Sequence, residues 1–86
     1  MKVWKPSLLE IEKTRDWGTW NKEVSEFPWY YEDQETCYIL EGKAYATDDE
    51  GNKVIFRKGD MVRFEKGLSC TWKILKDIRK KYLFGE

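Results

Sequence analysis

The stretch ETCYILEGKAYATDDEGNKVIF, residues 35–56, decides the fold class, because it contains two apolar segments joined by a turn. The first segment is apolar on both faces of an extended chain, which is typical of a strand that is covered on both sides. Gly42 predicts a bend or bulge midway along this strand. DDEGNK, residues 48–53, concentrates residues that form tight turns. We therefore expect a β-hairpin whose tip lies at residues 48–53.

The remainder of the chain predicts further short strands. After the hairpin come the apolar segments VIF, MVRF, CTWKIL and YLF, which are separated by RKGD, EKGLS and KDIRKK. Strands at this spacing indicate a sandwich or a barrel. Residues 7–16 follow Pro6 and fit a short helix, although a strand remains an alternative there. The sequence thus predicts an all-β fold with at most one or two short helices.

Composition limits the domain count and the partners. A chain of 86 residues supports one hydrophobic core, so we expect a single domain over residues 1–86. Sixteen basic residues balance sixteen acidic ones, and a neutral chain offers no field that would attract nucleic acid or an anionic membrane. The basic cluster KILKDIRKK is interpreted as a solvated sheet edge that its lysines protect from aggregation. We expect neither a nucleic-acid nor a membrane partner.

The two cysteines, Cys37 and Cys70, bear on the compartment. One bridge is too few for a disulfide-stabilised secreted domain, and the start MKVWKPSLLEIEK has no apolar signal segment. No apolar run approaches the roughly 18 residues of a membrane span. We therefore expect a cytoplasmic protein with free thiols.

Two pairs of residues match the spacing of the cupin motifs. Glu35 and Gly42 stand at the separation of the first motif, and Gly59 and Gly67 occupy the glycine positions of the second. With its aromatic run before the first motif, the chain resembles the small single-domain cupins grouped with the ureidoglycine aminohydrolase cupin domain. The resemblance implies a cupin-type jelly-roll β-barrel over residues 17–84 with a pocket inside, preceded by an N-terminal segment, residues 1–16.

The metal ligands of cupins are mostly missing from this sequence. Metal-binding cupins place two histidines shortly before the glutamate, and the chain has no histidine. The corresponding positions hold Pro28 and Tyr30 or Trp29 and Tyr31, and the second motif's histidine is replaced by Cys70. Of the four ligands, only Glu35 remains. We therefore expect no metal and no cofactor; a soft site of Glu35, Cys37 and Cys70 is conceivable only if both sulfurs point inward.

Glu35 is the candidate acid or base. It is either a solvated carboxylate at a strand end or a pocket carboxyl, and an apolar pocket would disfavour its ionised form and make it a hydrogen-bond donor to a neutral ligand. Without histidine, the Cys–His type of nucleophilic catalysis is excluded. Aromatic residues fill the core of any small barrel, but some of them can also line a pocket. The candidate ligand-binding residues are Trp29, Tyr31, Tyr38, Cys70 and Trp72.

Two functional hypotheses remain open. In the first, the protein binds a small polar metabolite in the barrel pocket without a metal, either as a binding module or as an enzyme that uses acid–base chemistry. In the second, it is a non-catalytic interaction or structural domain that has lost the metal site of its ancestors. Five Trp, five Tyr and four Phe are more aromatic side chains than a small barrel easily encloses. We therefore also expect a homodimer.

Overall fold

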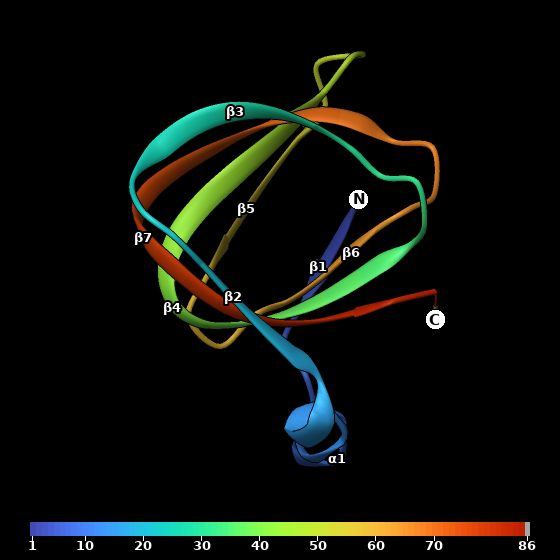
Figure 1. Ribbon diagram of the computed structural model, residues 1–86, viewed down its shortest axis with the longest axis vertical. Helices are drawn as coiled ribbons and strands as arrows, with labels where there is room; N and C mark the ends of the chain where they lie inside the picture. The colour runs from blue at the N-terminus through green and yellow to red at the C-terminus, as the bar shows by residue number, and fades with distance from the viewer. Residues whose placement is uncertain (86) are drawn as a thin grey trace.

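The computed structural model describes residues 1–85, which form a seven-stranded antiparallel sheet that curls around an interior (Figure 1). The strands are β1 (Lys2–Trp4), β2 (Gly18–Lys22), β3 (Ser25–Tyr30), β4 (Glu35–Asp48), β5 (Lys53–Arg57), β6 (Met61–Phe64) and β7 (Ser69–Phe84). One short helix, α1 (Leu8–Lys13), continues into a 3-10 turn, Thr14–Asp16, outside the curled sheet. The predicted fold class, an all-β jelly-roll with at most one or two short helices, is confirmed.

The two long strands, β4 and β7, pair with each other along almost their whole length. On its other side, β4 pairs first with β6 and then with β5, while β7 pairs first with β3 and then with β2. β1 adds to the free side of β6. Both halves of the barrel therefore share β4 and β7, which curve around the interior in Figure 1.

Gly42 forms the predicted bend in β4. The register with β7 shifts on both sides of this residue, and its φ of 97° lies in the region that favours glycine. A Cβ atom at Gly42 would lie only 2.2 Å from the backbone oxygen of Asp77 on β7. The bulge also changes which side chains face inward, from odd-numbered residues such as Ile39 to even-numbered ones such as Ala44.

Aromatic rings fill much of the core. The rings of Tyr31 and Phe64 are stacked with their centroids 4.6 Å apart, and Phe56 meets Trp72 edge to face at 5.0 Å. All four side chains are at most 2% exposed. Edge-to-face and offset-stacked pairs each stabilise by about 0.5–1.5 kcal/mol beyond their burial, so this cluster fixes the relative positions of the strands.

Local sequence signals account for the hairpin and the helix. β4 ends at Asp48 and β5 begins at Lys53, so the hairpin tip lies where the sequence predicted it. The Asp48 side chain closes the turn by accepting hydrogen bonds from the backbone N–H groups of Glu50 and Asn52, both at 2.9 Å. At the start of α1, Ser7 and Glu10 form a capping box. No helix within residues 1–85 has the length and apolarity of a membrane span.

One sequence prediction was wrong. KDIRKK was expected to be a turn between two strands, and KILKDIRKK a solvated edge, but the structure forms one continuous strand of sixteen residues, β7. This strand is central, because it has partners on both sides. Ile78 and Lys80 point inward and are buried, while their neighbours carry the exposed charges. Pairing on both sides overrides the weak strand propensity of lysine and aspartate.

The close approach at Gly42 generates a stability prediction. In Gly42→Ala, the added Cβ must displace backbone and adopt an unfavourable φ, so we expect the free energy of unfolding to fall by about 3 kcal/mol or more. Gly51→Ala is the matched control, because Gly51 also has a positive φ but nothing within 4 Å of its Cβ position. It should lose only about 1–2 kcal/mol. Urea denaturation measures both; equal losses would contradict the steric explanation.

Candidate functional site

A pocket opens into the interior of the barrel between β2, β3, the start of β4 and the inward face of β7. Its volume is about 180 Å³. The lining residues are Trp20, Phe27, Trp29, Tyr31, Glu35, Trp72, Lys80, Tyr82 and Phe84. Seven of these nine are aromatic, so largely apolar walls surround one acidic side chain, Glu35, and one basic side chain, Lys80.

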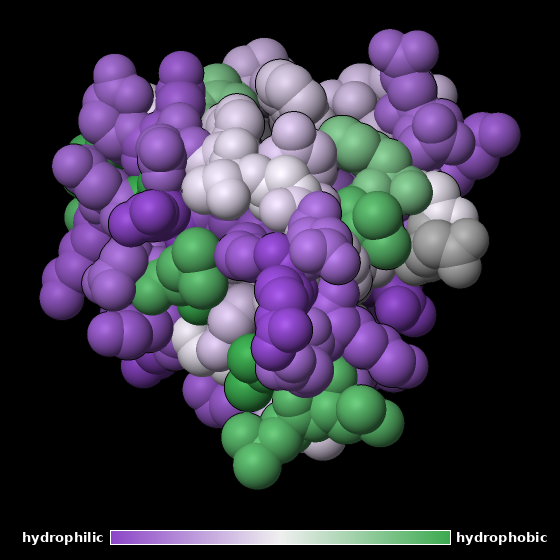
Figure 2. All heavy atoms as spheres, turned by 60° about the horizontal axis from the view of Figure 1, so that its bottom comes forward, coloured by the Kyte–Doolittle hydropathy of each residue, from purple (hydrophilic) through white to green (hydrophobic). Residues whose placement is uncertain are grey.

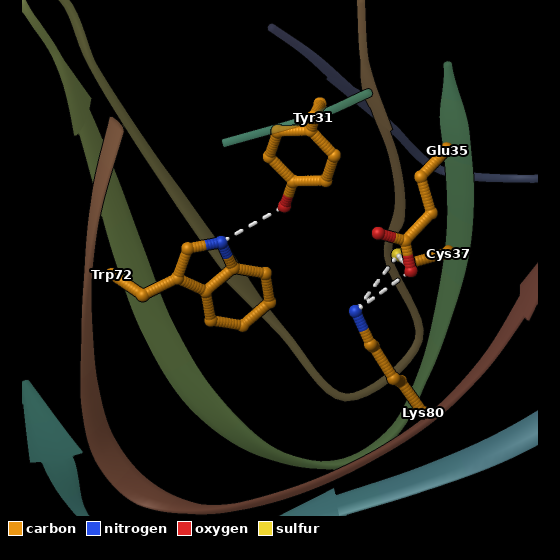
Figure 3. A network of polar contacts seen from close by, with 5 residues as sticks. All are labelled: Tyr31, Glu35, Cys37, Trp72 and Lys80. Carbon is orange, nitrogen blue, oxygen red and sulfur yellow. Dashed lines mark hydrogen bonds and ion pairs between the residues drawn. The ribbon is translucent and has the colours of Figure 1, made fainter. Parts of the chain in front are cut away.

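Glu35 and Lys80 form a buried ion pair at this pocket (Figure 3). The Lys80 Nζ atom lies 3.0 Å from Oε2 of Glu35, and the two residues are 5% and 3% exposed. Antiparallel pairing of β4 with β7 brings together the two strand ends that carry them. Because the two charges compensate each other, the polar centre of the pocket is formally neutral.

Cys37 joins this ion pair. It lies two residues after Glu35 on β4, so both side chains point to the same face of the strand. Its thiol donates to Oε2 of Glu35 at 3.3 Å, and its sulfur accepts from Nζ of Lys80 at 3.4 Å. The three side chains thus form a closed triangle of polar contacts beside the rings.

The ammonium of Lys80 also contacts aromatic faces. Nζ lies 4.6 Å from the ring centroid of Trp20 and 4.9 Å from that of Trp72, which are distances of cation–π attraction. On the far side of the pocket, Nε1 of Trp72 donates to the hydroxyl of Tyr31 at 3.0 Å. Lys80 is therefore held by charge and by ring faces, and Trp72 is oriented by Tyr31.

Some hydrogen-bonding capacity in the pocket is unused by residues 1–85. Both contacts of Glu35 end on Oε2, which leaves Oε1 without a partner in this part of the chain. Since no fully buried side-chain oxygen or nitrogen there lacks a partner, Oε1 must be reachable from the cavity. Figure 3 shows the second carboxylate oxygen turned toward Tyr31 and Trp72. The ammonium of Lys80 has three N–H donors and two polar acceptors, so one N–H beside the ring faces has no polar acceptor within residues 1–85.

Three titratable side chains of the site, Tyr31, Cys37 and Lys80, have raised pKa values. Burial raises the pKa of Cys37 to about 12, and burial together with the charge of Glu35 raises the pKa of Tyr31. Burial alone would lower the pKa of Lys80, but Cys37 and Glu35 beside it raise that pKa above the usual lysine value. Tyr31, Cys37 and Lys80 therefore stay protonated at neutral pH, as a phenol, a thiol and an ammonium.

The structure brings together four of the six residues that the sequence pointed to. Trp29, Tyr31, Glu35 and Trp72 line the pocket. Tyr38 does not, because even-numbered side chains in the first half of β4 point away from the interior. Cys70 is buried at the opposite end of β7, where it pairs with Asp48 of β4 rather than with the Glu35 end.

Glu35 has a different role from the one expected. Of the two alternatives left open, the pocket position is supported, because Glu35 is 3% exposed and lines the cavity. It was expected to be a neutral hydrogen-bond donor, but it accepts from both Lys80 and Cys37. The expectation was wrong because Lys80 lies on a central strand rather than a solvated edge, and its ammonium supplies a positive charge beside the Glu35 carboxylate.

The alternation of buried residues along β7 was the signal that could have revealed Lys80. Cys70, Trp72 and Ile74 are buried at every second position; the count is interrupted at the exposed Lys76, where the register with β4 is irregular, and resumes at the buried Ile78 and Lys80. A lysine at an inward position of a central strand requires a buried partner. The other missed pocket residues are Trp20, Phe27, Tyr82 and Phe84.

Comparison with known proteins places the chain in a family. The family described as the EutQ-like cupin domain matches residues 9–82. The chain belongs to the EutQ-like cupin domain family. A comparison with curated proteins gave no match.

Solved structures agree with this membership. A DUF861 family protein from Thermotoga maritima is 48% identical to this cupin, with a TM-score of 0.93, and the match covers 96% of this chain and 97% of that one. An ethanolamine utilization protein Q from Salmonella typhimurium is 25% identical over 79% of this chain and 55% of its own, with a TM-score of 0.72. The EutQ protein of Clostridium difficile, at 21% identity and a TM-score of 0.73 over 96% of this chain and 67% of its own, shows the shared fold alone.

The residues of this EutQ-like cupin do not fit a metal centre of the cupin type. Within residues 1–85, no three His, Cys, Asp or Glu side chains are grouped so that they could hold a metal ion. The one carboxylate at the expected place, Glu35, already has a cation beside it, the ammonium of Lys80. A divalent ion at Glu35 would have to displace Lys80 and would find too few ligands.

The protonated groups of the site generate a pH prediction. In the unfolded chain Cys37 loses its proton near its ordinary pKa of 9.0, whereas in the folded chain it keeps it up to about 12. Cys70, whose pKa burial raises to about 11, acts in the same direction over this range, and Tyr31 and Lys80, whose folded pKa values are also raised, do so at higher pH. Because the folded state binds more protons, the free energy of unfolding should be constant up to about pH 8 and fall above about pH 9.

Urea denaturation between pH 7 and pH 11 measures this dependence. Cys37→Ser, whose hydroxyl does not titrate in this range, should show a smaller fall than the unsubstituted protein. A stability that stays constant to pH 11, or an equal fall in Cys37→Ser, would contradict the assignment of one of the linked protons to Cys37.

Proposed function

We propose that this cupin binds a small polar molecule in its barrel pocket without a metal. The supporting observation is the combination of ring walls with polar groups that converge on one cavity, namely Oε1 of Glu35, a donor of Lys80 and the hydroxyl of Tyr31. Binding pockets are mostly apolar, and a few placed polar groups fix the orientation of the ligand. With about 180 Å³ available, the ligand is smaller than most drug-sized molecules.

The polar groups of the pocket are suited to binding a ligand by hydrogen bonds. Tyr31, Cys37 and Lys80 hold their protons at neutral pH, so each is a donor rather than a base. The carboxylate of Glu35 is the acceptor that reaches the cavity. Incubation with a mixed set of small metabolites, followed by native mass spectrometry, tests whether a compound is retained. Retention of none of them would favour the interaction-domain alternative.

Trp29 supplies the sharpest test of where a retained compound binds. It lies on the rim of the pocket and is 45% exposed, so Trp29→Ala removes a wall with little loss of packing. We expect about tenfold weaker binding, the equivalent of one aromatic contact. Tyr30→Ala is the matched control, because Tyr30 is the next residue of β3, is 57% exposed and does not line this pocket.

Tyr30→Ala should change the dissociation constant by less than about twofold, since it removes no pocket contact. Isothermal titration calorimetry with the retained compound measures both variants. Equal weakening by both substitutions, or no weakening by Trp29→Ala, would show that the compound binds elsewhere.

We also propose that the protein forms a homodimer. No residue of α1 is buried, and Leu8 and Leu9 are 86% and 66% exposed. Figure 2 shows hydrophobic residues in separate patches among hydrophilic ones on the face it displays. Exposed apolar patches on a small domain often mark association sites. Sedimentation equilibrium should give twice the mass of one chain, and Leu8→Glu with Leu9→Glu should give one; a single-chain mass before substitution would contradict the proposal.

A further inference from the structure

We infer that the barrel pocket selects an uncharged molecule that carries a hydrogen-bond donor and an acceptor on neighbouring atoms, with a primary carboxamide as the simplest such group. The inference rests on the proposed binding function and adds the chemical class of the ligand. It follows from the charges, the free hydrogen-bonding positions and the walls of the pocket.

The charges of the pocket disfavour an ion of either sign. Glu35 and Lys80 are both almost fully buried, so water screens them poorly. A cation that approached Oε1 of Glu35 would meet the ammonium of Lys80, which lies 3.0 Å from the same carboxylate. An anion that approached Lys80 would meet Glu35 for the same reason. Either ion would also lose its own hydration, whereas a neutral ligand avoids both costs.

Aromatic rings do not make this pocket a site for ammonium ligands. The faces of Trp20 and Trp72 would otherwise suit a cation, but the ammonium of Lys80 already contacts both of them, at 4.6 and 4.9 Å. A second cation there would be repelled by Lys80. The ammonium of Lys80 thus already occupies the position over these rings that a ligand cation would take.

The free hydrogen-bonding positions are complementary to a carboxamide. Oε1 of Glu35 is an acceptor and the remaining N–H of Lys80 is a donor, and they belong to two groups in direct contact. A ligand N–H can donate to Oε1 while the adjacent carbonyl oxygen accepts from Lys80. The hydroxyl of Tyr31, which accepts from Trp72, also lines the pocket and keeps its proton, so it offers the ligand a further donor. Buried polar positions of this kind discriminate strongly against ligands that leave them unpaired.

The walls favour a flat or compact apolar substituent on that group. Trp20, Phe27 and Trp72 form a ring cluster, with Phe27 stacked on Trp72 at 6.0 Å and Trp20 edge-on to Trp72 at 5.9 Å. Together with the small volume, these faces suit one ring or a short branched chain and exclude a long one.

Benzamide, benzoate and benzamidinium test the inference, because they have the same shape and differ in charge. Each is titrated at pH 7 into the isotopically labelled protein, and the indole N–H signals of Trp20 and Trp72 report occupancy of the pocket. We expect benzamide to bind at least tenfold more tightly than either ion. Benzoate or benzamidinium binding as tightly as benzamide would overturn the inference, and so would the absence of shifts with all three.

Two substitutions should invert the preference. Glu35→Gln leaves the charge of Lys80 without its counterion, so benzoate should become the tightest of the three. Lys80→Met leaves the carboxylate of Glu35, so benzamidinium should become the tightest. Circular dichroism establishes that each variant folds, and if one does not, the unsubstituted protein and the other variant decide the question. An unchanged benzamide preference in a folded variant would overturn the inference.

An exposed ion pair on the neighbouring strands provides the matched control. Lys73 and Glu26 lie 3.6 Å apart on β7 and β3, have side chains that are 42% and 60% exposed, and do not line the pocket. Glu26→Gln and Lys73→Met change the net charge of the protein in the same way and should keep the preference for benzamide. If all three probes fail but the metabolite screen retains a compound, the binding function stands and the ligand class proposed here is wrong.

Discussion

The pairing of β4 with β7 is the constraint on which the rest of the structure depends. These two strands carry partners on both sides, so every other strand except β1 is attached directly to one of them. Their long register is interrupted at Gly42, where the absence of a side chain lets the two backbones approach. The sheet curls around this bend, and the same register places Lys80 opposite Ile39, from where its long side chain reaches Glu35 four residues earlier on β4. Fold and site therefore share one cause.

The ion pair that results is better explained by the site than by stability. Removing two charges from water costs several kcal/mol per ion, and their attraction often does little more than offset that cost. Here the contacts of Lys80 with Cys37 and two indole faces offset part of the desolvation cost. One carboxylate oxygen of Glu35 remains open to the cavity. A hydrophobic pair in the same place would pack without this cost. The polar centre is consistent with a pocket that recognises a polar group.

Much of the fold was predictable because its signals are local. The hairpin at residues 48–53 and the bend at Gly42 each depend on a few adjacent residues whose conformational preferences are strong. The helix after Pro6 was predicted with a strand as its alternative, and its capping box settles it as a helix. Lys80 was not predictable in the same way, because its burial depends on whether β7 is one strand or two. That in turn depends on β2 and β4, which lie far away in the sequence and supply partners on both sides of the KDIRKK segment. The part of the site that was missed is the part fixed by tertiary pairing.

A double-mutant cycle on Glu35 and Lys80 tests most directly whether these two residues form one unit. The free energy of unfolding is measured by urea denaturation for Glu35→Gln, Lys80→Met, the double variant and the unsubstituted protein. Each single variant leaves one buried charge without its counterion, whereas the double variant leaves none. We expect the double variant to lose less stability than the sum of the single ones, with a coupling energy of about 1.5–3 kcal/mol. Losses that add to within about 0.5 kcal/mol would contradict the ion pair as the centre of the site.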